Sequence, residues 1–237
     1  MSDVGWEYWF QRNIAKAGGF FKFMYDSWVY CAPLYNALYA LLPPPRRILE
    51  VGCGYGTSAA ILSLLGYDVL GIDIDPKMLE HARGNLASLG LADRVRLELG
   101  DAFNLSKYHG IFDATFSDGV LEHFHLDEAV AALKEQARAA KYIVATIPTK
   151  YLREETNIWM YPHTPRSFKA ICHKAGLKIL RFLAFGDPNG RHFQILREAL
   201  PQFIYYHLRR KFFPVTVAAI CTSKEYNRWN TIALSVY

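Results

Sequence analysis

Two periods of apolar residues follow one another along this chain, and the change between them falls at three consecutive prolines, residues 43–45. Between residues 6 and 42, Trp, Phe, Met and Leu recur at steps of three and four, which is the spacing of one face of an α-helix. Gly18 and Gly19 divide this region, and the prolines end it because proline cannot continue a helix. The pattern predicts two N-terminal helices that lie outside the main sheet.

Beyond the prolines, short apolar runs alternate with segments of helical period. Strands are predicted at residues 48–51, 67–72, 95–99, 112–116, 142–147, 177–185 and 231–237. Helices are predicted at residues 57–65, 76–88, 122–140, 165–175 and 191–210, the last interrupted by Pro201. Residues 215–221 fit a strand or a helix equally well. Because alternating strands and helices need crossover connections, we expect an α/β fold with a mainly parallel sheet and helices on both faces.

A glycine-rich turn joins the first predicted strand to the first helix after it. Glycines at 52, 54 and 56 allow a tight turn and a close approach of the backbone to a ligand. The dinucleotide fingerprint G-x-G-x-x-G would need glycine at position 57, where Thr57 stands, so that class of site is excluded. Glu50, two residues before the first glycine, would repel a pyrophosphate but suits a cationic ligand.

This E-x-G-x-G-x-G segment resembles the signature of class I S-adenosylmethionine-dependent methyltransferases, and the resemblance extends over about residues 46–185. It implies a Rossmann-like three-layer sandwich with a seven-stranded, mostly parallel sheet. It also implies S-adenosyl-L-methionine as the cofactor and S-adenosyl-L-homocysteine as the product. The chain then divides into an N-terminal helical lid, residues 1–45, and a methyltransferase domain, residues 46–237, with a C-terminal insertion at about 190–228.

Acidic residues follow the next predicted strands as well. Asp73, Asp101 and Asp118 stand where the second, third and fourth strands end, and the carboxyl ends of strands are where open α/β sheets bind ligands. Each alone would be an ordinary loop acid, and Asp73 or Asp75 could cap the helix that Pro76 opens. Together at the ends of successive strands they predict a cofactor site.

The resemblance assigns roles to these positions. Asp73 takes the two ribose hydroxyls, Ile74 packs on the adenine and Asp101 accepts the adenine amino group, whereas the methionine end lies at the end of the fourth strand. Tyr25 is similar to a lid tyrosine that reaches the cofactor carboxylate. The residues expected at the cofactor are Glu50, Gly52, Cys53, Gly54, Gly56, Asp73, Ile74, Asp101, Ala102, Ser117, Asp118 and Tyr25.

Two histidines are candidate catalytic bases, since methyl transfer asks a protein mainly to align a nucleophile and remove a proton. His123 lies in a Val-Leu-Glu-His segment similar to that of small-molecule members, near the expected methyl group. His163 lies in an aromatic, proline-containing loop that crosses the substrate mouth in the resemblance. For either residue, a structural role in the core or at the surface is the competing interpretation.

Composition removes several other classes of protein. The four cysteines form no C-x-x-C pair and no carboxylate–histidine cluster has ligand spacing, so neither a zinc site nor any other metal site is expected. The N-terminus is acidic where a signal peptide is basic, and no apolar run reaches the length of a membrane span. We therefore expect a reduced, cytoplasmic protein.

Most of the formal net charge of +5 is concentrated between residues 197 and 228, where basic residues outnumber acidic ones and aromatic residues are interleaved. This segment fits a solvated helix, a substrate cover, a homodimer surface or a peripheral contact with a membrane. Nucleic acid is not an expected partner, because no appended RNA-binding module is recognisable.

The predicted function is methyl transfer to oxygen or nitrogen of a small, partly apolar or aromatic molecule by direct in-line displacement. One alternative is a lipid or quinone methyltransferase at a membrane surface. Others are a non-catalytic cofactor-binding protein of the same fold, and methylation of RNA or protein.

Overall fold

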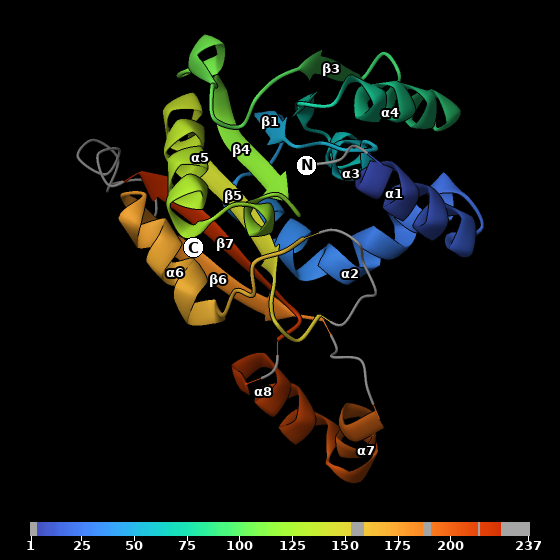
Figure 1. Ribbon diagram of the computed structural model, residues 1–237, viewed down its shortest axis with the longest axis vertical. Helices are drawn as coiled ribbons and strands as arrows, with labels where there is room; N and C mark the ends of the chain where they lie inside the picture. Colours follow the sequence, from blue (N-terminus) through green and yellow to red (C-terminus); the bar gives the residue numbers. More distant parts are fainter. Residues whose placement is uncertain (1–3, 153–158, 187–190, 213, 224–237) are drawn as a thin grey trace.

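A computed structural model describes residues 4–152, 159–186, 191–212 and 214–223. Its centre is a seven-stranded sheet in the order β3-β2-β1-β4-β5-β7-β6 (Figure 1). The strands are β1 (Arg47–Val51), β2 (Asp68–Asp73), β3 (Val95–Leu99), β4 (Phe112–Asp118), β5 (Ala140–Pro148), β6 (Leu177–Phe185) and β7 (Thr216–Ser223). The pairs among β1 to β5 are parallel, and β7 is antiparallel to both β5 and β6.

Helices cover both faces of this sheet. They are α1 (Val4–Ala17), α2 (Phe20–Leu41), α3 (Thr57–Leu64), α4 (Pro76–Ser88), α5 (Leu126–Ala139), α6 (Pro165–Lys174), α7 (Arg191–Ala199) and α8 (Gln202–Phe212). Helices α2, α3 and α4 lie on one face, and α5 and α6 lie on the other (Figure 1). The mostly parallel, three-layer architecture expected from the sequence is therefore confirmed.

The two-residue period of the strands divides the core between these layers. Ile48 and Val69 belong to the cluster formed with α2 and α3, whereas their neighbours Leu49 and Leu70 belong to a cluster on the opposite face. All four are buried, because a sheet covered on both faces buries both sets of side chains. This double burial explains why the strands are continuous apolar runs in the sequence.

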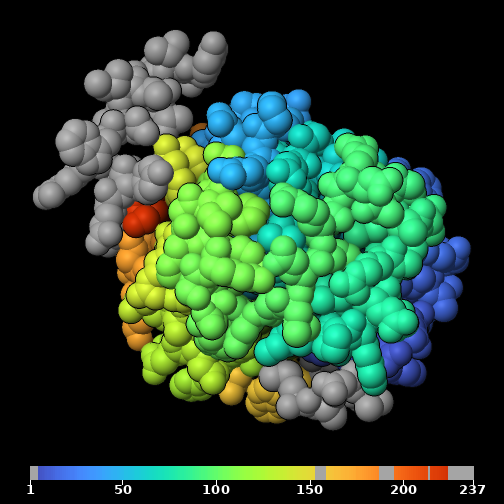
Figure 2. Space-filling view, turned by 90° about the horizontal axis from the view of Figure 1, so that it is seen from above, coloured from blue at the N-terminus to red at the C-terminus, as the bar shows by residue number. Residues whose placement is uncertain are grey.

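The two ends of the sheet are covered differently. Seen from above, the end where the parallel strands begin is filled mostly by the teal and green chain between α4 and α5, with α1 in dark blue at the margin (Figure 2). At the other end, α7 and α8 extend away from the sheet (Figure 1).

One expectation for an individual element needs correction. The helix predicted from residue 122 begins instead at Leu126, after a short 3-10 turn over Leu121–His123. The N–H of His125 donates to Glu128 Oε2 at 2.8 Å, and this cap fixes the start of α5. Residues 215–221, which fitted either state, belong to strand β7, while the strand predicted at 231–237 lies outside the described residues.

The packing of α2 on the sheet makes a stability prediction. Leu34 is fully buried between α2 and the sheet, whereas Val29 on the same helix is 57% exposed. Leu34→Ala is expected to lower the free energy of unfolding by about 2–5 kcal/mol, because it removes buried methyl groups and leaves a cavity. Val29→Ala is the matched control, expected to change it by less than about 0.5 kcal/mol. Urea unfolding measures both, and equal losses would show that α2 does not pack as described.

Candidate active site

The glycine turn is fastened to the neighbouring strand. The backbone N–H groups of Gly52 and Cys53 both donate to the carbonyl oxygen of Ile72, at 2.8 and 2.9 Å. Gly52 has φ of 73°, and a Cβ there would lie 2.5 Å from Cγ2 of Val120, so only glycine fits. The turn therefore brings the ends of β1 and β2 close to the segment that follows β4.

Asp73, at the end of β2, is held by the same turn. Its Oδ2 accepts from the N–H of Gly54 at 2.8 Å, and its Oδ1 accepts from the N–H of Asp75 at 3.0 Å. Burial raises the pKa of Asp73, while these N–H donors lower it. Asp75 caps α4 by accepting from the N–H of Lys77, so Asp73 is not the helix cap and its carboxylate faces the turn.

Three carboxyl groups lie at the ends of β1 and β4 and just beyond. Glu50 and Glu122 are each 3% exposed, and Oε2 of each has no hydrogen-bond partner. Asp118 accepts from the hydroxyl of Thr146 and, at 3.5 Å, from that of Ser58. Burial raises the pKa of all three, that of Glu122 to about 8, and the charge of Asp118 adds to the rise at Glu50 and Glu122.

Tyr35 of α2 extends this polar group into the core. Its hydroxyl donates to Ser58 Oγ at 3.2 Å, and its ring stacks on Phe116 of β4 with 5.8 Å between centroids. Burial raises the pKa of Tyr35, so this hydroxyl keeps its proton. Helices α2 and α3 are thereby linked to the carboxylate at the end of β4.

The turn after β4 is fixed by the loop after β5. The N–H of Tyr161 donates to the carbonyl oxygen of Glu122 at 2.8 Å, and Nδ1 of His123 lies 2.8 Å from the carbonyl oxygen of Trp159. Because a carbonyl can only accept, Nδ1 carries the proton and Nε2 has a free lone pair. That Nε2 has no hydrogen-bond partner, lies 3.6 Å from Glu122 Oε1, and belongs to a ring whose pKa is lowered by burial.

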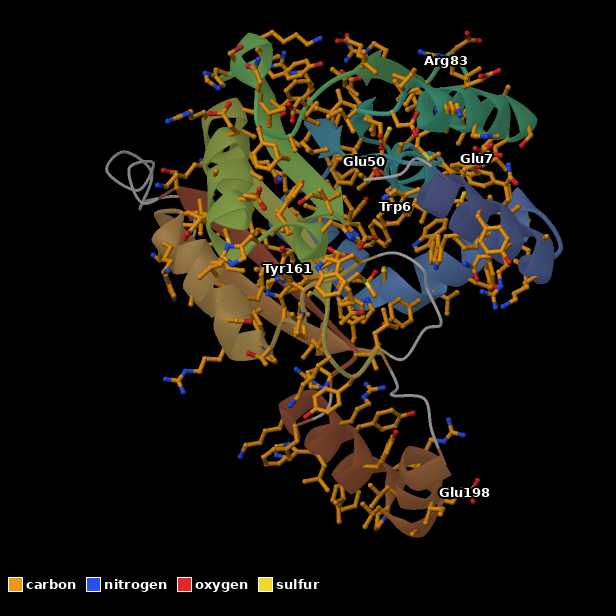
Figure 3. The ribbon with its side chains drawn as sticks, in the orientation of Figure 1. Trp6, Glu7, Glu50, Arg83, Tyr161 and Glu198 are labelled. Atoms are coloured by element: carbon orange, nitrogen blue, oxygen red, sulfur yellow. The ribbon has the colours of Figure 1, made fainter. Side chains whose placement is uncertain are left out.

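Helix α1 lies across these groups. The ring of Trp6 meets that of His123 edge-on at 4.6 Å, and Phe10 stacks on Tyr55 of the glycine turn at 4.5 Å. Figure 3 labels Trp6 on α1, Glu50 on β1 and Tyr161 on the loop after β5. Aromatic side chains of α1 thus contact both the turn after β4 and the glycine turn.

Known proteins resemble the part of the chain that carries this geometry. Residues 48–142 match the family model of a methyltransferase domain. Ajmaline N-methyltransferase from Rauvolfia serpentina is 33% identical over 97 residues, 40% of this chain and 33% of the relative. A protein-L-isoaspartate O-methyltransferase from Methylorubrum populi is 35% identical over 108 residues, 45% of this chain and 48% of the relative. The chain spans less than half the length of these two relatives.

Solved structures share the fold over most of the chain. Magnesium protoporphyrin IX methyltransferase from Synechocystis with bound S-adenosylhomocysteine gives a TM-score of 0.61 at 18% identity, covering 94% of this chain and 88% of that one. Over residues 48–142 the chain matches the model of a methyltransferase domain, and its fold is that of this solved methyltransferase. The [4+2]-cyclase SpnF has the same fold, with a TM-score of 0.60 at 17% identity over 81% of this chain and 80% of its own.

In this methyltransferase domain most of the expected cofactor residues come together. Those that meet at the carboxyl ends of β1, β2 and β4 are Glu50, Gly52, Cys53, Gly54, Gly56, Asp73 and Asp118. Beyond β3, Asp101 accepts from the N–H of Phe103 at 2.9 Å and is followed by the half-buried Ala102. Ile74 is 70% exposed next to Asp73, so its side chain offers an apolar surface to a ligand.

Three other expected site residues do not join this group through their side chains. Ser117 is fully buried, and its hydroxyl exchanges hydrogen bonds with Gln136 of α5, so only its backbone faces the strand end. Tyr25 is 50% exposed on α2, where Lys22 lies 5.9 Å from its ring. His163 lies beyond β5, is buried with Nε2 unpartnered, and its pKa is lowered by burial. Their roles at the cofactor or acceptor stay predictions.

Other residues at the site were not foreseen. Glu122 belongs to the Val-Leu-Glu-His segment, but of that segment only His123 is predicted from the sequence as a site residue. Tyr35 and Ser58 carry no signal in the sequence, because helical spacing makes them indistinguishable from core residues. Trp6 and Phe10 were expected to pack as part of a lid, but their contacts with particular site residues depend on the fold.

The residues present fit S-adenosylmethionine. Glu50 offers a buried carboxylate oxygen without a partner beside the glycine turn, and an ammonium group would supply that partner. Asp73 is fixed by two N–H donors and retains acceptor capacity for a vicinal diol. Among the described residues, no three His, Cys, Asp or Glu side chains are grouped so that they could hold a metal ion.

The raised pKa of Glu122 predicts a pH dependence of stability. The folded protein keeps this proton up to about pH 8, whereas the ordinary pKa of a glutamic acid side chain is 4.5. The free energy of unfolding should therefore fall as the pH rises from 4.5 to about 8. The loss is at most about 1.4 kcal/mol per pH unit. Glu122→Gln lacks this titration, so its stability relative to wild type should increase from pH 5.5 to 7.5 in urea unfolding.

The comparison isolates Glu122 because both proteins contain His123. Burial lowers the pKa of that histidine, so its contribution has the opposite sign: the free energy of unfolding rises with pH up to 6.5, the ordinary pKa of a histidine side chain. A difference between the two proteins that stays constant with pH would show that Glu122 titrates normally.

Proposed function

We propose that this protein transfers a methyl group from S-adenosylmethionine to an oxygen or nitrogen of a small, partly apolar or aromatic molecule. The observation that carries the proposal is the unpartnered, buried carboxylate oxygen of Glu50 beside the glycine turn. A buried charge without a partner is costly, so this position favours a ligand that brings a positive group. The methyltransferase names of the relatives support the same reaction.

Each part of the cofactor has a residue to hold it. Glu50 binds the ammonium group, Asp73 the ribose hydroxyls, and Ile74 packs on the adenine, whose amino group meets Asp101. The bound cofactor supplies a methyl group already activated by a sulfonium. The chain then has to orient the acceptor in line with that methyl group and to remove a proton.

Two features of the site serve these tasks. Trp6 and Phe10 of α1 cover the glycine turn and the turn after β4, which keeps water from the acceptor. His123 presents the free lone pair of Nε2 inside this enclosure and is the proposed base. His163 is a second candidate, because its Nε2 is also buried without a partner.

A second candidate function follows from α7 and α8. They extend from the end of the molecule where β4 and β5 finish (Figure 1). On α8, Phe203 is 76% exposed and Tyr206 is 45% exposed, and Arg210 continues the same helical face. No described helix is both long and apolar enough to cross a bilayer. An exposed aromatic face beside basic residues suits the surface of an anionic membrane, and hence a lipid or quinone acceptor.

Asp73→Ala tests the proposed cofactor site. It is expected to weaken binding of S-adenosylhomocysteine by about 1.5–3 kcal/mol, because the ribose hydroxyls lose a charged acceptor. Calorimetric titration measures the change. Asp68→Ala, at the opposite end of β2 where Asp68 pairs with Arg96, is the matched control and should leave affinity unchanged. Equal affinity of the Asp73 variant and wild type would mean that the ribose binds elsewhere.

The fold alone does not require methyl transfer, since one structural neighbour is a [4+2]-cyclase. Transfer of labelled methyl groups to a panel of amines, phenols and carboxylates distinguishes a methyltransferase from a protein of the same fold that does not transfer methyl groups. Tight binding of the cofactor with no labelled product from any of the acceptors would favour a non-catalytic protein of the same fold.

The membrane-surface candidate predicts sedimentation with vesicles of phosphatidylglycerol and phosphatidylcholine at low salt. Binding should fall in 0.5 M NaCl, because salt screens exposed charges. The variant Phe203→Ala/Arg210→Ala should bind less, whereas Phe21→Ala, which changes a residue 65% exposed on α2, should bind as wild type. Absence of wild-type protein from the vesicle pellet at low salt would exclude this candidate.

A further inference from the structure

The group of Glu50, Asp118 and Glu122 lacks a basic partner that would balance its negative charge when it ionises. Among the described residues, none of the three forms an ion pair with lysine or arginine, and the basic side chain next to Glu122 is His123 at 3.6 Å, whose pKa is lowered by burial. A carboxylate left alone in the interior costs several kcal/mol on the order-of-magnitude scale for buried ions, unless a cation reaches it. In the free protein a proton spares Glu122 this cost up to about pH 8, and a cation that reaches the carboxylate from outside would replace that proton.

The cofactor accounts for only part of this charge. Its carboxylate, ammonium and sulfonium give it one net positive charge, and under the proposed function the ammonium belongs to Glu50. Asp118 already accepts from the hydroxyls of Thr146 and Ser58. Glu122 is different, because its Oε2 has neither a hydroxyl donor nor a cofactor group assigned to it.

The surroundings of Glu122 suit an organic cation. The turn that carries Glu122 is held by one aromatic loop: the N–H of Tyr161 donates to the backbone carbonyl of Glu122, and Nδ1 of His123 donates to that of Trp159. From the other side, Trp6 packs against His123 with 4.6 Å between ring centroids. A carboxylate among aromatic side chains is the combination that binds alkylammonium groups.

We infer that the methyl acceptor is an amine, bound through its nitrogen to the carboxylate of Glu122. This inference rests on the proposed function and narrows its acceptor from oxygen or nitrogen to nitrogen. A phenol is a poorer fit, because the phenolate needed for attack would face the charges of Glu122 and Asp118.

For an amine acceptor, Glu122 takes the place of His123 as the base, and every proton and electron pair in the transfer is then accounted for. The ammonium form of the acceptor gives one N–H proton to Oε2 of Glu122, which frees the nitrogen lone pair. That lone pair forms a bond to the methyl carbon, the carbon–sulfur bond breaks, and its electron pair stays on sulfur. The product is the methylated ammonium with neutral Glu122, which returns its proton to water. With a pKa of about 8, Glu122 is a stronger base than an ordinary carboxylate.

The test compares two ligands, the methylated forms of benzylamine and of benzyl alcohol, which differ in having nitrogen or oxygen at the same position. The full-length protein is saturated with S-adenosylhomocysteine and titrated with N-methylbenzylamine or with benzyl methyl ether. The amine is expected to bind at least tenfold more tightly than the ether. In Glu122→Gln this preference should disappear, while the affinity for S-adenosylhomocysteine stays within twofold of wild type.

Asp127→Asn is the matched control, since Asp127 is an exposed acid on the first turn of α5. It should keep the preference for the amine. Transfer of labelled methyl groups from S-adenosylmethionine to benzylamine but not to benzyl alcohol is the second expected result, and Glu122→Gln should lose it.

The outcomes separate this inference from the function on which it rests. Protein that does not bind S-adenosylhomocysteine overturns the proposed function itself. Protein that binds it but shows no preference for the amine, or keeps the preference in Glu122→Gln, overturns the role of Glu122 alone. Labelled product from benzyl alcohol and none from benzylamine would likewise overturn the choice of nitrogen.

Discussion

Burial of carboxyl groups without basic partners is the constraint on which the site depends. Parallel strands bring their carboxyl ends to one edge, and in this chain Glu50 is the last residue but one of β1, Asp118 ends β4, and Glu122 lies just beyond. Desolvation raises the pKa of each group, and the charge of Asp118 adds to the rise at Glu50 and Glu122. The free protein therefore holds a proton on Glu122 that a bound cation would replace. The affinity of the site for positive ligands and its instability when empty therefore have the same physical origin.

The first helix completes this site from outside the sheet. Trp6 reaches the turn after β4, Phe10 lies over the glycine turn, and Glu7 pairs with His81 of α4 at 3.3 Å. The contacts span the ends of several strands that are distant in sequence (Figure 3). Because they are mostly aromatic contacts at a partly exposed surface, α1 can cover a ligand without forming part of the main core.

Stability and binding are supplied by separate parts of the molecule. Helix α2 is anchored by fully buried residues such as Leu34 and Leu38, and the packed layers hold the strand ends in register. Helix α8 carries exposed aromatic residues, and no described residue of α7 or α8 belongs to the two largest core clusters. A scaffold of this kind allows the acceptor side to vary while the cofactor side stays fixed.

Sequence by itself determined the alternation of strands and helices, the glycine turn and the acids at the strand ends. These features are local, because periodicity, glycine spacing and strand ends can be read within a few residues of each other. The sequence did not decide whether residues 215–221 form a strand or a helix, because their place between β5 and β6 depends on pairing with strands that are distant in the sequence. Only the tertiary structure decided that Asp73 faces the turn while Asp75 caps α4, that the Ser117 side chain points to α5, and that Glu122 is buried without a partner. Direction and burial of a side chain are set by what the rest of the chain packs against it, and no local pattern records that.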